Sequence, residues 1–534
     1  MTNRLPDPAL QVSLAEDLDA RIAEWSATSS GIVSLFFAPS ASDHAPRPTT
    51  PNAGDGHDRL YIAFASGPQA TVNQLELVEI EAGLIDRLAP YLSSDGAPYC
   101  ILADAHSDLA KLRRRGVMPR RFGCIRTAAT LLAEGADGRR DDRPLDWCAR
   151  DALGIELAAL PDRRSLAQRC GQMIPILRAY TGRLRERGLT RVFGLECELL
   201  PHVIEMEQTG IAIDTAAFER VVAGWHAERD QTTQPARLTR LDKLLSTYRY
   251  WARDYADYDG RIRCRLAPLA TDSGRFACSA PNLQQVPTEH TAPGLRACFR
   301  APVGRRLIIA DYAQIELRVA AHVADCQALR EVFRRGGDPH RATAATLMRK
   351  PAADVSEHER KLAKAINFGF LFGMGSKRFA GYAKTSYGIE LDHDQAQRAR
   401  EAFLATFPGI AAWHRRTGAL SRPSIDKGVT VTTVMGRRKR FAPGEFSFTS
   451  ALNIPVQGTA AEGFKRAMID VAGPLRELDG HGVLCVHDEY VAEVPQAHAD
   501  AACQIVESTL ARSMASIVDS VPIVVECRVA DFWG

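Results

Sequence analysis

Short apolar runs alternate with amphipathic stretches over the first part of the chain. Gly31–Ala38 and Leu60–Ala65 are apolar runs of strand length, whereas Glu79–Leu92 and Asp108–Arg115 space their apolar residues as helices do. A Pro-, Ser- and Asp-rich stretch, residues 40–58, separates the two strands and is typical of a long solvated loop. This alternation predicts an α/β domain that extends to about residue 190.

The rest of the chain has a mostly helical pattern with a few short strands. We expect a boundary near Arg185–Arg191, where a basic segment precedes a new helix that begins at about Phe193. Farther on, Leu307–Ala310 is a short apolar run that suits a buried strand, and it ends at Asp311, where helical spacing takes over. A carboxylate at such a strand end is expected at the edge of a site.

A second carboxylate is predicted at a tight turn. Val483–Val486 and Tyr490–Val494 are apolar strand segments separated only by the residues HDE, as in a hairpin, which presents Asp488 at the turn. If this hairpin and the strand before Asp311 are neighbours in one sheet, the two aspartates can share two Mg²⁺ ions roughly 3.5–4 Å apart, the arrangement used for in-line phosphoryl displacement. The alternative for each aspartate alone is an ordinary turn or cap residue.

A third candidate element is the segment HERKLAKAINFGFLFGMGSKRF, which we predict to be one helix over residues 358–379. Arg360, Lys364, Phe368 and Phe372 recur every four residues, so two cations and two aromatic rings fall along one face. Such a face can bind a nucleoside triphosphate, with cations on the phosphates and a ring against the base. The alternative is that the rings belong to the core and the cations are solvated.

Composition limits these hypotheses only a little. The chain has 534 residues, 46% hydrophobic and 25% charged, which predicts a globular protein of about two to four domains. The net charge is only +3, so a nucleic-acid partner must be held by local clusters of cations. Residues 237–265 form one such stretch, interpreted as a surface that grips a nucleic-acid backbone rather than a merely solvated helix, with the cations and aromatics Arg240, Lys243, Arg249, Arg253, Arg261, Arg263, Tyr248, Tyr250 and Trp251.

The cysteines and the N-terminal segment indicate an intracellular, cytoplasmic protein. The 12 cysteines are scattered without a C-x-x-C pair, which favours reduced structural thiols over a zinc site or a disulfide scaffold. The N-terminal segment has no signal-type apolar run, and no 18 consecutive apolar residues occur elsewhere, so no membrane partner is expected.

Three segments in order resemble the polymerase motifs of family A DNA polymerases, the group of bacterial DNA polymerase I. They are DYAQIELR from Asp311, RKLAKAINFGFLFG from Arg360, and VHDE from Val486. The resemblance extends from about Phe193 to Gly534, and its order makes it far more specific than any one motif. Supporting matches are TDSGRFACSAPNLQQVP at residues 271–287, DPHRATAATL at 338–347, MGRRKRF at 435–441 and NIPVQGTAAEGFKRAM at 453–468.

The resemblance implies a two-metal active site. It assigns Asp311 and Asp488 as ligands of two Mg²⁺ ions, which Mn²⁺ can replace, with the main-chain carbonyl of Tyr312 assisting and Glu489 nearby. It also places Lys364 on the triphosphate, where it can protonate the leaving pyrophosphate. The residues that the family match assigns to the incoming nucleotide are Arg360, Lys364, Phe368, Phe372, Glu316, His340 and Gln314.

The family match also gives individual roles to several of these residues. Glu316 is matched to the steric gate, which with Phe368 crowds the sugar 2′ position and excludes ribonucleotides. Phe372 is expected to pack beside the nascent base pair, and His340 is a weaker candidate for the triphosphate. Phe368 in place of Tyr implies discrimination against dideoxynucleotides. The residues matched to the primer end and to the minor groove, where donors can check pairing geometry without reading sequence, are Arg275, Asn282, Gln284, Gln457 and His487.

The implied architecture is multidomain, α/β and α+β. Residues 1–190 would form a ribonuclease H-like, 3′→5′ exonuclease-type α/β domain, and residues 191–534 a right-hand polymerase. In that polymerase, a shortened helical thumb takes about 193–265, a palm with an antiparallel sheet takes 266–320 and 420–534, and helical fingers take 321–419. The expected activity is DNA-templated DNA synthesis on primer–template DNA with dNTPs, in repair or gap filling, by a monomer.

Two departures from the family pattern change the expected activity. Only a few helical turns separate the GIAID-like turn at Gly210–Asp214 from the KSTY-like segment at Lys243–Tyr248, so the thumb is short and low processivity is expected. The first exonuclease strand should carry an Asp-x-Glu pair, yet Leu35–Ser40 contains no carboxylate, and Leu166–Cys170 replaces Tyr-x-x-x-Asp. Asp108 is a possible remnant of the remaining motif, and an inactive exonuclease without proofreading is predicted.

Three other functions are alternatives to DNA synthesis. A single-subunit RNA polymerase shares the metal carboxylates, but the gate matched at Glu316 and Phe368 argues against it. A catalytically weak DNA-binding scaffold is a second alternative, and the intact set of Asp311, Lys364 and Asp488 argues against it. A nuclease acting alone is the weakest alternative, because its carboxylates are missing.

Overall fold

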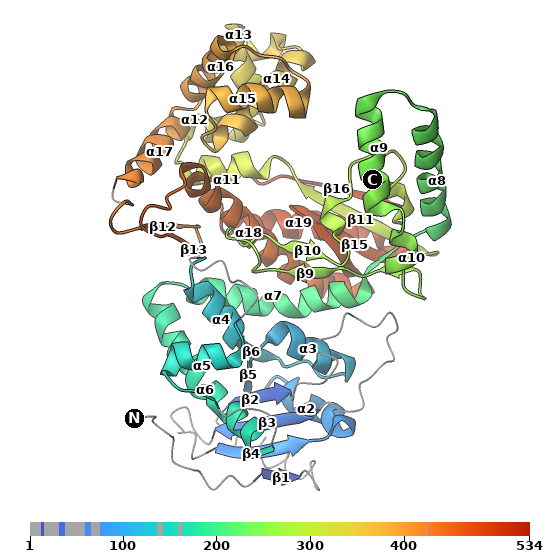
Figure 1. The fold of residues 1–534 in the computed structure, drawn as a ribbon, viewed down its shortest axis with the longest axis vertical. Coiled ribbons are helices and arrows are strands. Elements are labelled where there is room, and N and C mark those ends of the chain that lie inside the picture. The colour runs from blue at the N-terminus through green and yellow to red at the C-terminus, as the bar shows by residue number, and fades with distance from the viewer. Residues whose placement is uncertain are drawn as a thin grey trace. The chain divides into compact units, whose positions relative to one another are not determined.

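The computed structural model describes residues 12–14, 31–37, 59–65, 75–135, 143–157, 163–422 and 424–534 (Figure 1). The chain forms two compact units. Unit 1 comprises residues 1–133, 137–209 and 255–263, and unit 2 comprises residues 134–136, 210–254 and 264–534. The loop predicted over residues 40–58 lies outside the described residues.

Unit 1 is built on a six-stranded mixed sheet with the strand order β1-β4-β3-β2-β5-β6. β3 runs antiparallel to both β2 and β4, whereas β5 runs parallel to β2 and β6 parallel to β5. β1 pairs in parallel with β4 at the edge. The strands are β1 (Val12–Leu14), β2 (Ile32–Phe37), β3 (Leu60–Ala65), β4 (Leu75–Ile80), β5 (Tyr99–Leu102) and β6 (Arg121–Cys124).

The predicted strands of unit 1 are confirmed as β2 and β3, but the helix predicted from Glu79 begins too early. Glu79 lies in β4, whose backbone pairs with β3 along its whole length. Val78, Glu79 and Ile80 are all buried, as expected of a strand that is covered on both faces. Helical structure starts only at Ala82, because the apolar spacing of a short strand and of a helix are similar over so few residues.

Helices cover the sheet of unit 1. The longest, α6 (Arg163–Glu186), packs on β2 and β3, and α7 (Thr190–Thr209) packs on α3 and α4. The helix expected at about Phe193 thus begins at Thr190, and the two compact units divide after it. The other segments are the 3₁₀ helix η4 (Ala82–Leu88), α2 (Ala89–Leu92), α3 (Ala105–Arg114), α4 (Ile125–Leu132), α5 (Leu145–Leu153) and the short strand β8 (Arg261–Ile262).

Unit 2 is centred on a four-stranded antiparallel sheet with the order β14-β15-β11-β16. The predicted apolar run forms the middle of β11 (Arg305–Tyr312), and its residues 307–310 are all buried. The predicted hairpin is confirmed as β14 (His481–Val486) and β15 (Glu489–Pro495), and β16 (Val525–Ala530) closes the other edge. The long helices α18 (Phe448–Glu477) and α19 (Ala499–Ala515) pack together, and α19 lies on β11 and β16.

A helical lobe, residues 315–418, follows β11 (Figure 1). Its core contains packed aromatic rings: the Phe370 and Phe379 centroids lie 4.3 Å apart with the rings tilted, and Phe403 and Phe407 meet edge to face at 5.6 Å. The helices of this lobe are α11 (Ile315–Val323), α12 (Gln327–Arg334), α13 (Pro339–Met348), α14 (Glu357–Leu371), α15 (Ser376–Tyr382), α16 (His393–Thr406) and α17 (Pro408–Gly418).

The single helix predicted over residues 358–379 is wrong, because α14 ends at Leu371 and α15 begins at Ser376. Gly373 has a φ of 75°, which breaks the helix, and a Cβ at this position would lie 2.5 Å from the ring of Phe448. Phe372 is therefore the residue that caps α14, and it does not continue the face that carries Arg360 and Lys364.

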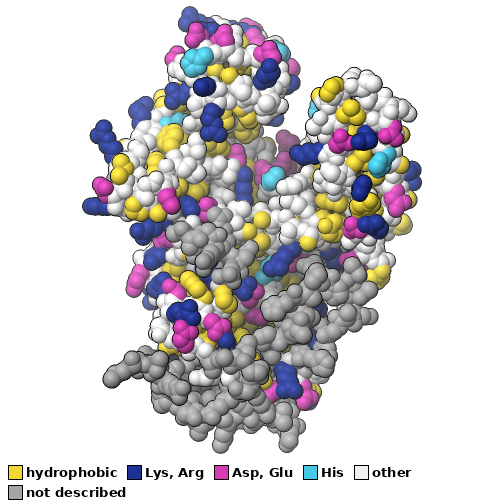
Figure 2. Space-filling view, viewed as in Figure 1, with side chains coloured by type: hydrophobic (Ala, Val, Ile, Leu, Met, Phe, Trp, Pro, Cys, Tyr) yellow, Lys and Arg dark blue, Asp and Glu magenta, His cyan; other side chains and the backbone are white. Residues whose placement is uncertain are grey.

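Two antiparallel helices, α8 (Thr215–Gln231) and α9 (Pro235–Tyr248), form a hairpin in unit 2, followed by the short α10 (Trp251–Tyr255). Figure 2 shows a hollow in unit 2 between this hairpin and the helical lobe. Within the described part of the chain, no helix is both long and apolar enough to cross a membrane. The remaining strands of unit 2 are β7 (Ile211–Ala212), β9 (Arg265–Ala267), β10 (Ala277–Ser279), β12 (Val429–Thr432) and β13 (Arg438–Phe441).

Candidate active site

The two predicted metal ligands come from neighbouring strands of the unit 2 sheet. Asp311 lies near the end of β11, directly opposite Glu489 at the start of β15. Glu489 in turn pairs with Val486 of β14, so Asp488 stands in the two-residue turn between these strands. The condition set by the sequence, that the strand and the hairpin are adjacent, is therefore met.

The two carboxylates are poorly stabilised in their charged form. Partial burial is the main cause that raises the pKa of Asp311 to about 7, although the side chain reaches solvent. The negative charges of Asp488 and Glu489 raise it further. Burial is also the main cause that raises the pKa of Asp488 to about 6. Two such neighbouring groups favour a divalent cation, which removes their repulsion, and carboxylate oxygens are the donors that Mg²⁺ prefers. The residues present thus fit the implied ions.

The third carboxylate, Glu489, is held by the end of the chain. The indole Nε1 of Trp533 donates a hydrogen bond of 2.7 Å to Glu489 Oε1, and Trp533 is fully buried. The guanidinium of Arg296 lies 4.4 Å from the centre of the indole ring. No pattern in the sequence singled out Trp533.

In the described ranges no three His, Cys, Asp or Glu side chains form a metal-binding group. The candidate donors are Asp311, Asp488 and the main-chain oxygen of Tyr312.

The Tyr312 side chain has a structural role. It is buried, and its hydroxyl donates a hydrogen bond of 2.8 Å to the carbonyl of Leu510 in α19. Only the main chain of Tyr312 is therefore left for the role that the family match gave it.

Glu316, the residue matched to the steric gate, is fixed by two other predicted site residues. Its Oε1 accepts a hydrogen bond of 2.6 Å from Arg275 Nη2 and one of 3.0 Å from Gln457 Nε2. Glu316 lies in the first turn of α11, where the helix dipole favours a negative charge. Gln314 caps this helix with a φ of 56°, so it sets the direction of the helix.

The other residues matched to DNA contacts gather near the β14–β15 turn. Gln284 Nε2 donates a hydrogen bond of 3.3 Å to the carbonyl of Cys485 in β14. Asn282 immediately precedes the 3₁₀ turn Leu283–Gln285 that carries Gln284, and its buried side-chain oxygen has no partner within the described residues. His487 lies in the turn itself, and the protein atoms that partly surround its ring, together with the charge of the nearby Arg275, lower its pKa.

Helix α14 presents two of the predicted nucleotide-binding cations. A capping box formed by Ser356 and Glu359 starts the helix. Arg360 Nε lies 2.5 Å from Asp338 Oδ2, so its charge is partly matched. Lys364, one turn later, is exposed and forms no ion pair with any described residue. Lys364 is therefore the cation on this face that is available to a phosphate.

His340 lies inside the protein. Its ring is 1% exposed, Nδ1 is 3.0 Å from Asn367 Nδ2, and the ring of Phe368 lies 5.8 Å away. Burial lowers the pKa of His340 to about 4, so it carries no charge at neutral pH. Asn367, which also accepts a hydrogen bond from Thr343, was missed in the sequence, although an amide on the apolar side of a helix is a signal.

In unit 1 an apolar cluster includes residues of the segment that, by the family pattern, would carry an exonuclease carboxylate. Tyr61 and Ala63 of β3 pack against Leu166, Ala167 and Cys170 of α6. The Ser34 hydroxyl donates a hydrogen bond of 2.7 Å to the carbonyl of Cys170. Of the segment Leu35–Ser40, the residues after Phe37 lie outside the described part.

Asp108, the predicted remnant, is buried and accepts a hydrogen bond of 3.0 Å from the main-chain N–H of Asp104. Burial and the charge of Asp104 raise its pKa to about 7.

The model of the family described as DNA polymerase family A matches residues 189–534. DNA polymerase I of Pseudomonas aeruginosa is 38% identical over 306 residues, which are 55% of this chain and 32% of that protein. The thermostable DNA polymerase I of Thermus aquaticus is 33% identical over 346 residues, 62% of this chain and 39% of that protein. The chain thus spans well under half the length of these curated relatives.

The fold of the whole chain also occurs among solved structures. The chain superposes on the POL domain of Pol1 from M. smegmatis, solved in complex with DNA primer–template and dNTP, with a TM-score of 0.77. The two chains are 22% identical, and the match covers 99% of this chain and 98% of the other. Since the family model covers most of the chain and includes every residue of the site in unit 2, the protein belongs to DNA polymerase family A.

Proposed function

We propose that the protein is a DNA-templated DNA polymerase, which adds deoxynucleotides from dNTPs to the 3′-hydroxyl of a primer. The observation that carries the proposal is the pair of destabilised carboxylates, Asp311 and Asp488, on adjacent strands of one sheet in a family A chain. The M. smegmatis relative was solved with primer–template DNA and dNTP, which supports the same partners for this chain. All the residues concerned lie on one chain, which fits a monomer.

Each residue of the site has a role that follows from its surroundings. Asp311, Asp488 and the main-chain carbonyl of Tyr312 would hold two Mg²⁺ ions, which supply charge neutralisation and activation of the hydroxyl when bound. Lys364 is exposed and unpaired within the described residues, so it can contact the triphosphate and give a proton to the departing pyrophosphate. Arg360 can contact the triphosphate as well only if its guanidinium binds the phosphate and Asp338 together, or if its ion pair with Asp338 breaks.

Template-directed extension of a labelled primer tests the proposal. With Mg²⁺ and all four dNTPs, the product is expected to lengthen to match the template, and each single dNTP is expected to be added only opposite its complement. A preference for rNTPs would favour the RNA polymerase alternative. DNA binding without extension would favour the scaffold.

Glu316→Ala is expected to relax sugar selection. Removing the side chain that Arg275 and Gln457 hold in place opens the space matched to the 2′ position, so ribonucleotide incorporation relative to deoxynucleotide is expected to rise about 10–100-fold. Competition between rNTP and dNTP in single-nucleotide addition measures the ratio. Gln457→Ala is the matched control, since it loosens Glu316 but leaves its carboxylate, and it should change the ratio much less.

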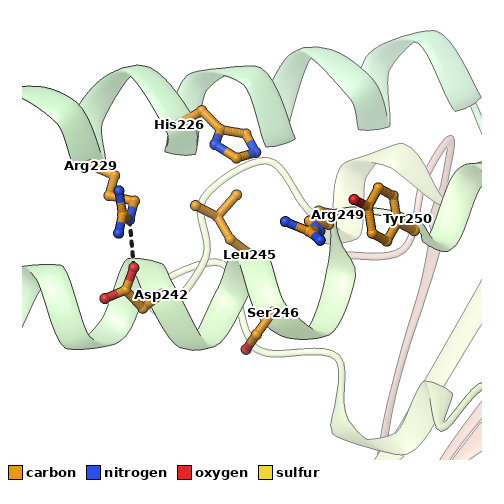
Figure 3. Close-up of a pocket in the computed structure, with 7 residues that line it drawn as sticks. All are labelled: His226, Arg229, Asp242, Leu245, Ser246, Arg249 and Tyr250. Carbon is orange, nitrogen blue, oxygen red and sulfur yellow. Dashed lines mark hydrogen bonds and ion pairs between the residues drawn. The ribbon is translucent and has the colours of Figure 1, made fainter.

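We propose that the α8–α9 hairpin grips the DNA backbone, as the short thumb expected from the sequence. A shallow cavity of about 490 Å³ lies on one face of it (Figure 3). Arg229 is paired with Asp242 there, whereas Arg249 stacks on Tyr250 at 4.2 Å and forms no ion pair within the described residues. Within the basic stretch itself, Arg253 is paired with Asp254 and Arg263 with Asp259, so the stretch offers fewer cations than its sequence suggests. Tyr248 and Trp251 are buried.

Low processivity is expected from this hairpin. At 1.5 Å per residue, α8 is only about 26 Å long, so it can follow little of the duplex. Extension in the presence of a DNA trap, which limits the enzyme to one encounter, is expected to add only a few nucleotides per binding event. Long products in the presence of the trap would contradict the prediction of low processivity. The addition of only a few nucleotides per binding event suits gap filling or repair.

We further propose that unit 1 is a ribonuclease H-like domain that has lost 3′→5′ exonuclease activity. The strand order β4-β3-β2-β5-β6, with β3 alone antiparallel to its neighbours, supports the fold. The apolar cluster around Tyr61 and Cys170 supports the loss, because metal ions need carboxylates. The scattered free cysteines fit a reducing compartment such as the cytoplasm.

No removal of a 3′-labelled nucleotide is expected from single-stranded DNA incubated with the protein and Mg²⁺. The Asp488→Ala variant is used alongside, because it separates exonuclease activity from reversal of synthesis at the other site. Metal-dependent release of label that persists in Asp488→Ala would show that unit 1 retains a working nuclease.

A further inference from the structure

Two thiols of unit 2 lie in direct contact. The Sγ of Cys503 is 3.0 Å from the Sγ of Cys527, although the residues are 24 positions apart in the sequence. All 12 cysteines are free, and these two are the partly exposed ones, whereas the other ten are buried. The pair is therefore the place on this chain where an oxidant in solution can reach two adjacent sulfurs.

The contact joins a helix to the strand next to the active site. Cys503 lies in the first turns of α19, and Cys527 lies in β16. In the sheet register Cys527 stands opposite Ala310, and its neighbour Glu526 stands opposite Asp311. A covalent link at this point ties α19 to the strand that pairs with the one carrying Asp311.

We propose that Cys503 and Cys527 are an oxidisable pair that forms a disulfide when the protein meets a peroxide. The Cys503 thiolate attacks one peroxide oxygen, the O–O bond breaks and water leaves, which yields a sulfenic acid at Cys503. The sulfur of Cys527 then attacks that of Cys503, the S–O bond breaks, and the S–S bond forms with loss of a second water. Two sulfurs are oxidised, the peroxide is reduced, and both thiol protons end in water.

The surroundings assign the order of the two steps. Burial, the hydrogen bond with Cys503, in which Cys527 keeps its proton, and the charge of Cys503 all raise the pKa of the Cys527 thiol. A thiol that stays protonated is a poor first nucleophile, so Cys503 reacts first and Cys527 resolves it. The sulfurs are already in contact, so the second step needs only a small side-chain rotation and outcompetes further oxidation of Cys503.

Peptide mapping of the full chain tests the proposal. The protein is treated with stoichiometric hydrogen peroxide, free thiols are alkylated under denaturing conditions, and peptides are identified without reduction. The expected result is one linked peptide pair containing Cys503 and Cys527, lighter than the reduced pair by two hydrogen atoms, with the other cysteines alkylated. Dithiothreitol should restore both thiols. The oxidised protein is also expected to unfold at a higher temperature than the reduced protein, because the link between residues 503 and 527 closes a loop and so lowers the conformational entropy of the unfolded chain.

Single substitutions provide the controls. Cys503→Ser, at a partly exposed helical position, should remove the linked peptide and the shift in unfolding temperature together. In Cys527→Ser, Cys503 should instead be recovered as sulfenic or sulfinic acid. The proposal is overturned if wild-type Cys503 appears in those oxidised forms while Cys527 is alkylated, if both stay reduced, or if links form mainly between other cysteines.

Discussion

Asp488→Asn is expected to lower the rate of nucleotide addition at least about a thousandfold, because it removes one of the two charges that would hold the metal ions while it keeps the shape of the side chain. Asp311→Asn should have an effect of the same size. Single-turnover primer extension at saturating dNTP and Mg²⁺ measures the rate of addition apart from DNA binding. Glu526→Gln is the matched control, since Glu526 lies opposite Asp311 in the sheet and is exposed on the edge strand. It should retain nearly full activity, and loss of activity in that variant would mean that the charge of the region, and not the aspartate pair, is what matters.

The same substitutions are expected to leave the fold intact, and Asp311→Asn to stabilise it without metal. The folded protein raises the pKa of Asp311 from 3.8 to about 7, so it disfavours the ionised carboxylate. The contribution of this group to folding is thus most favourable below about pH 4 and is lost as the pH rises toward 7. Asparagine does not ionise, so in EDTA at pH 8 the variant should unfold at a higher temperature than the wild type, with a smaller difference at pH 5. A variant that unfolds earlier would mean that lost activity reflects lost structure.

Much of the sheet could be predicted from the sequence because its signals are local. The apolar runs on both sides of Asp488 are a few residues long and are separated by two turn residues, so the hairpin follows from neighbouring residues alone. That Asp311 lies beside it depends on pairing between β11 and β15, which are far apart in the chain. The family resemblance supplied this step, since periodicity carries no information about which strands pair.

Side-chain partners were the part that local patterns could not predict. The carboxylate of Glu316 is held by Arg275 and Gln457, which are 41 and 141 positions away in the sequence. The four-residue spacing of α14 also failed at Phe372, because a glycine in the left-handed region ends the helix against the ring of Phe448. His340 turned inward because Asn367 and Phe368 surround its ring. Each case depends on a contact with a distant segment or on one glycine, and neither is visible in a hydrophobic pattern.

The supporting motifs pack together in a buried cluster beside Gln457, which explains why they accompany the site. Gly458 follows Gln457 in α18, and a Cβ there would lie 2.5 Å from Thr433 and 2.9 Å from the carbonyl of Ser273. A Cβ at Gly274 would lie 2.6 Å from the guanidinium of Arg437. Three segments that the family match picked out, around residues 273, 437 and 458, are therefore packed closely together, and this packing sets where Gln457 can reach.

Glu462→Ala is expected to destabilise unit 2 by about 3–5 kcal/mol, because it leaves the charge of a buried arginine without its counterion. Glu462 Oε1 lies 3.2 Å from Arg437 Nε and accepts a hydrogen bond of 2.9 Å from the Thr433 hydroxyl. The side chains of Arg437 and Glu462 are only 5% and 0% exposed, so water cannot replace the lost carboxylate. Urea unfolding followed by fluorescence measures the change in the free energy of unfolding.

Two comparisons separate this electrostatic cause from ordinary loss of packing. Glu331→Gln breaks the ion pair with Arg335, whose side chains are 47% and 77% exposed, and should cost less than about 1 kcal/mol. In the double variant Arg437→Met with Glu462→Leu, both charges of this pair are removed, so much of the lost stability should return, and the two single effects should not add. If Glu462→Ala is as stable as Glu331→Gln, the pair contributes little to folding. If the double variant is as unstable as the two single variants combined, the shape of these side chains, and not their charge, stabilises this buried cluster.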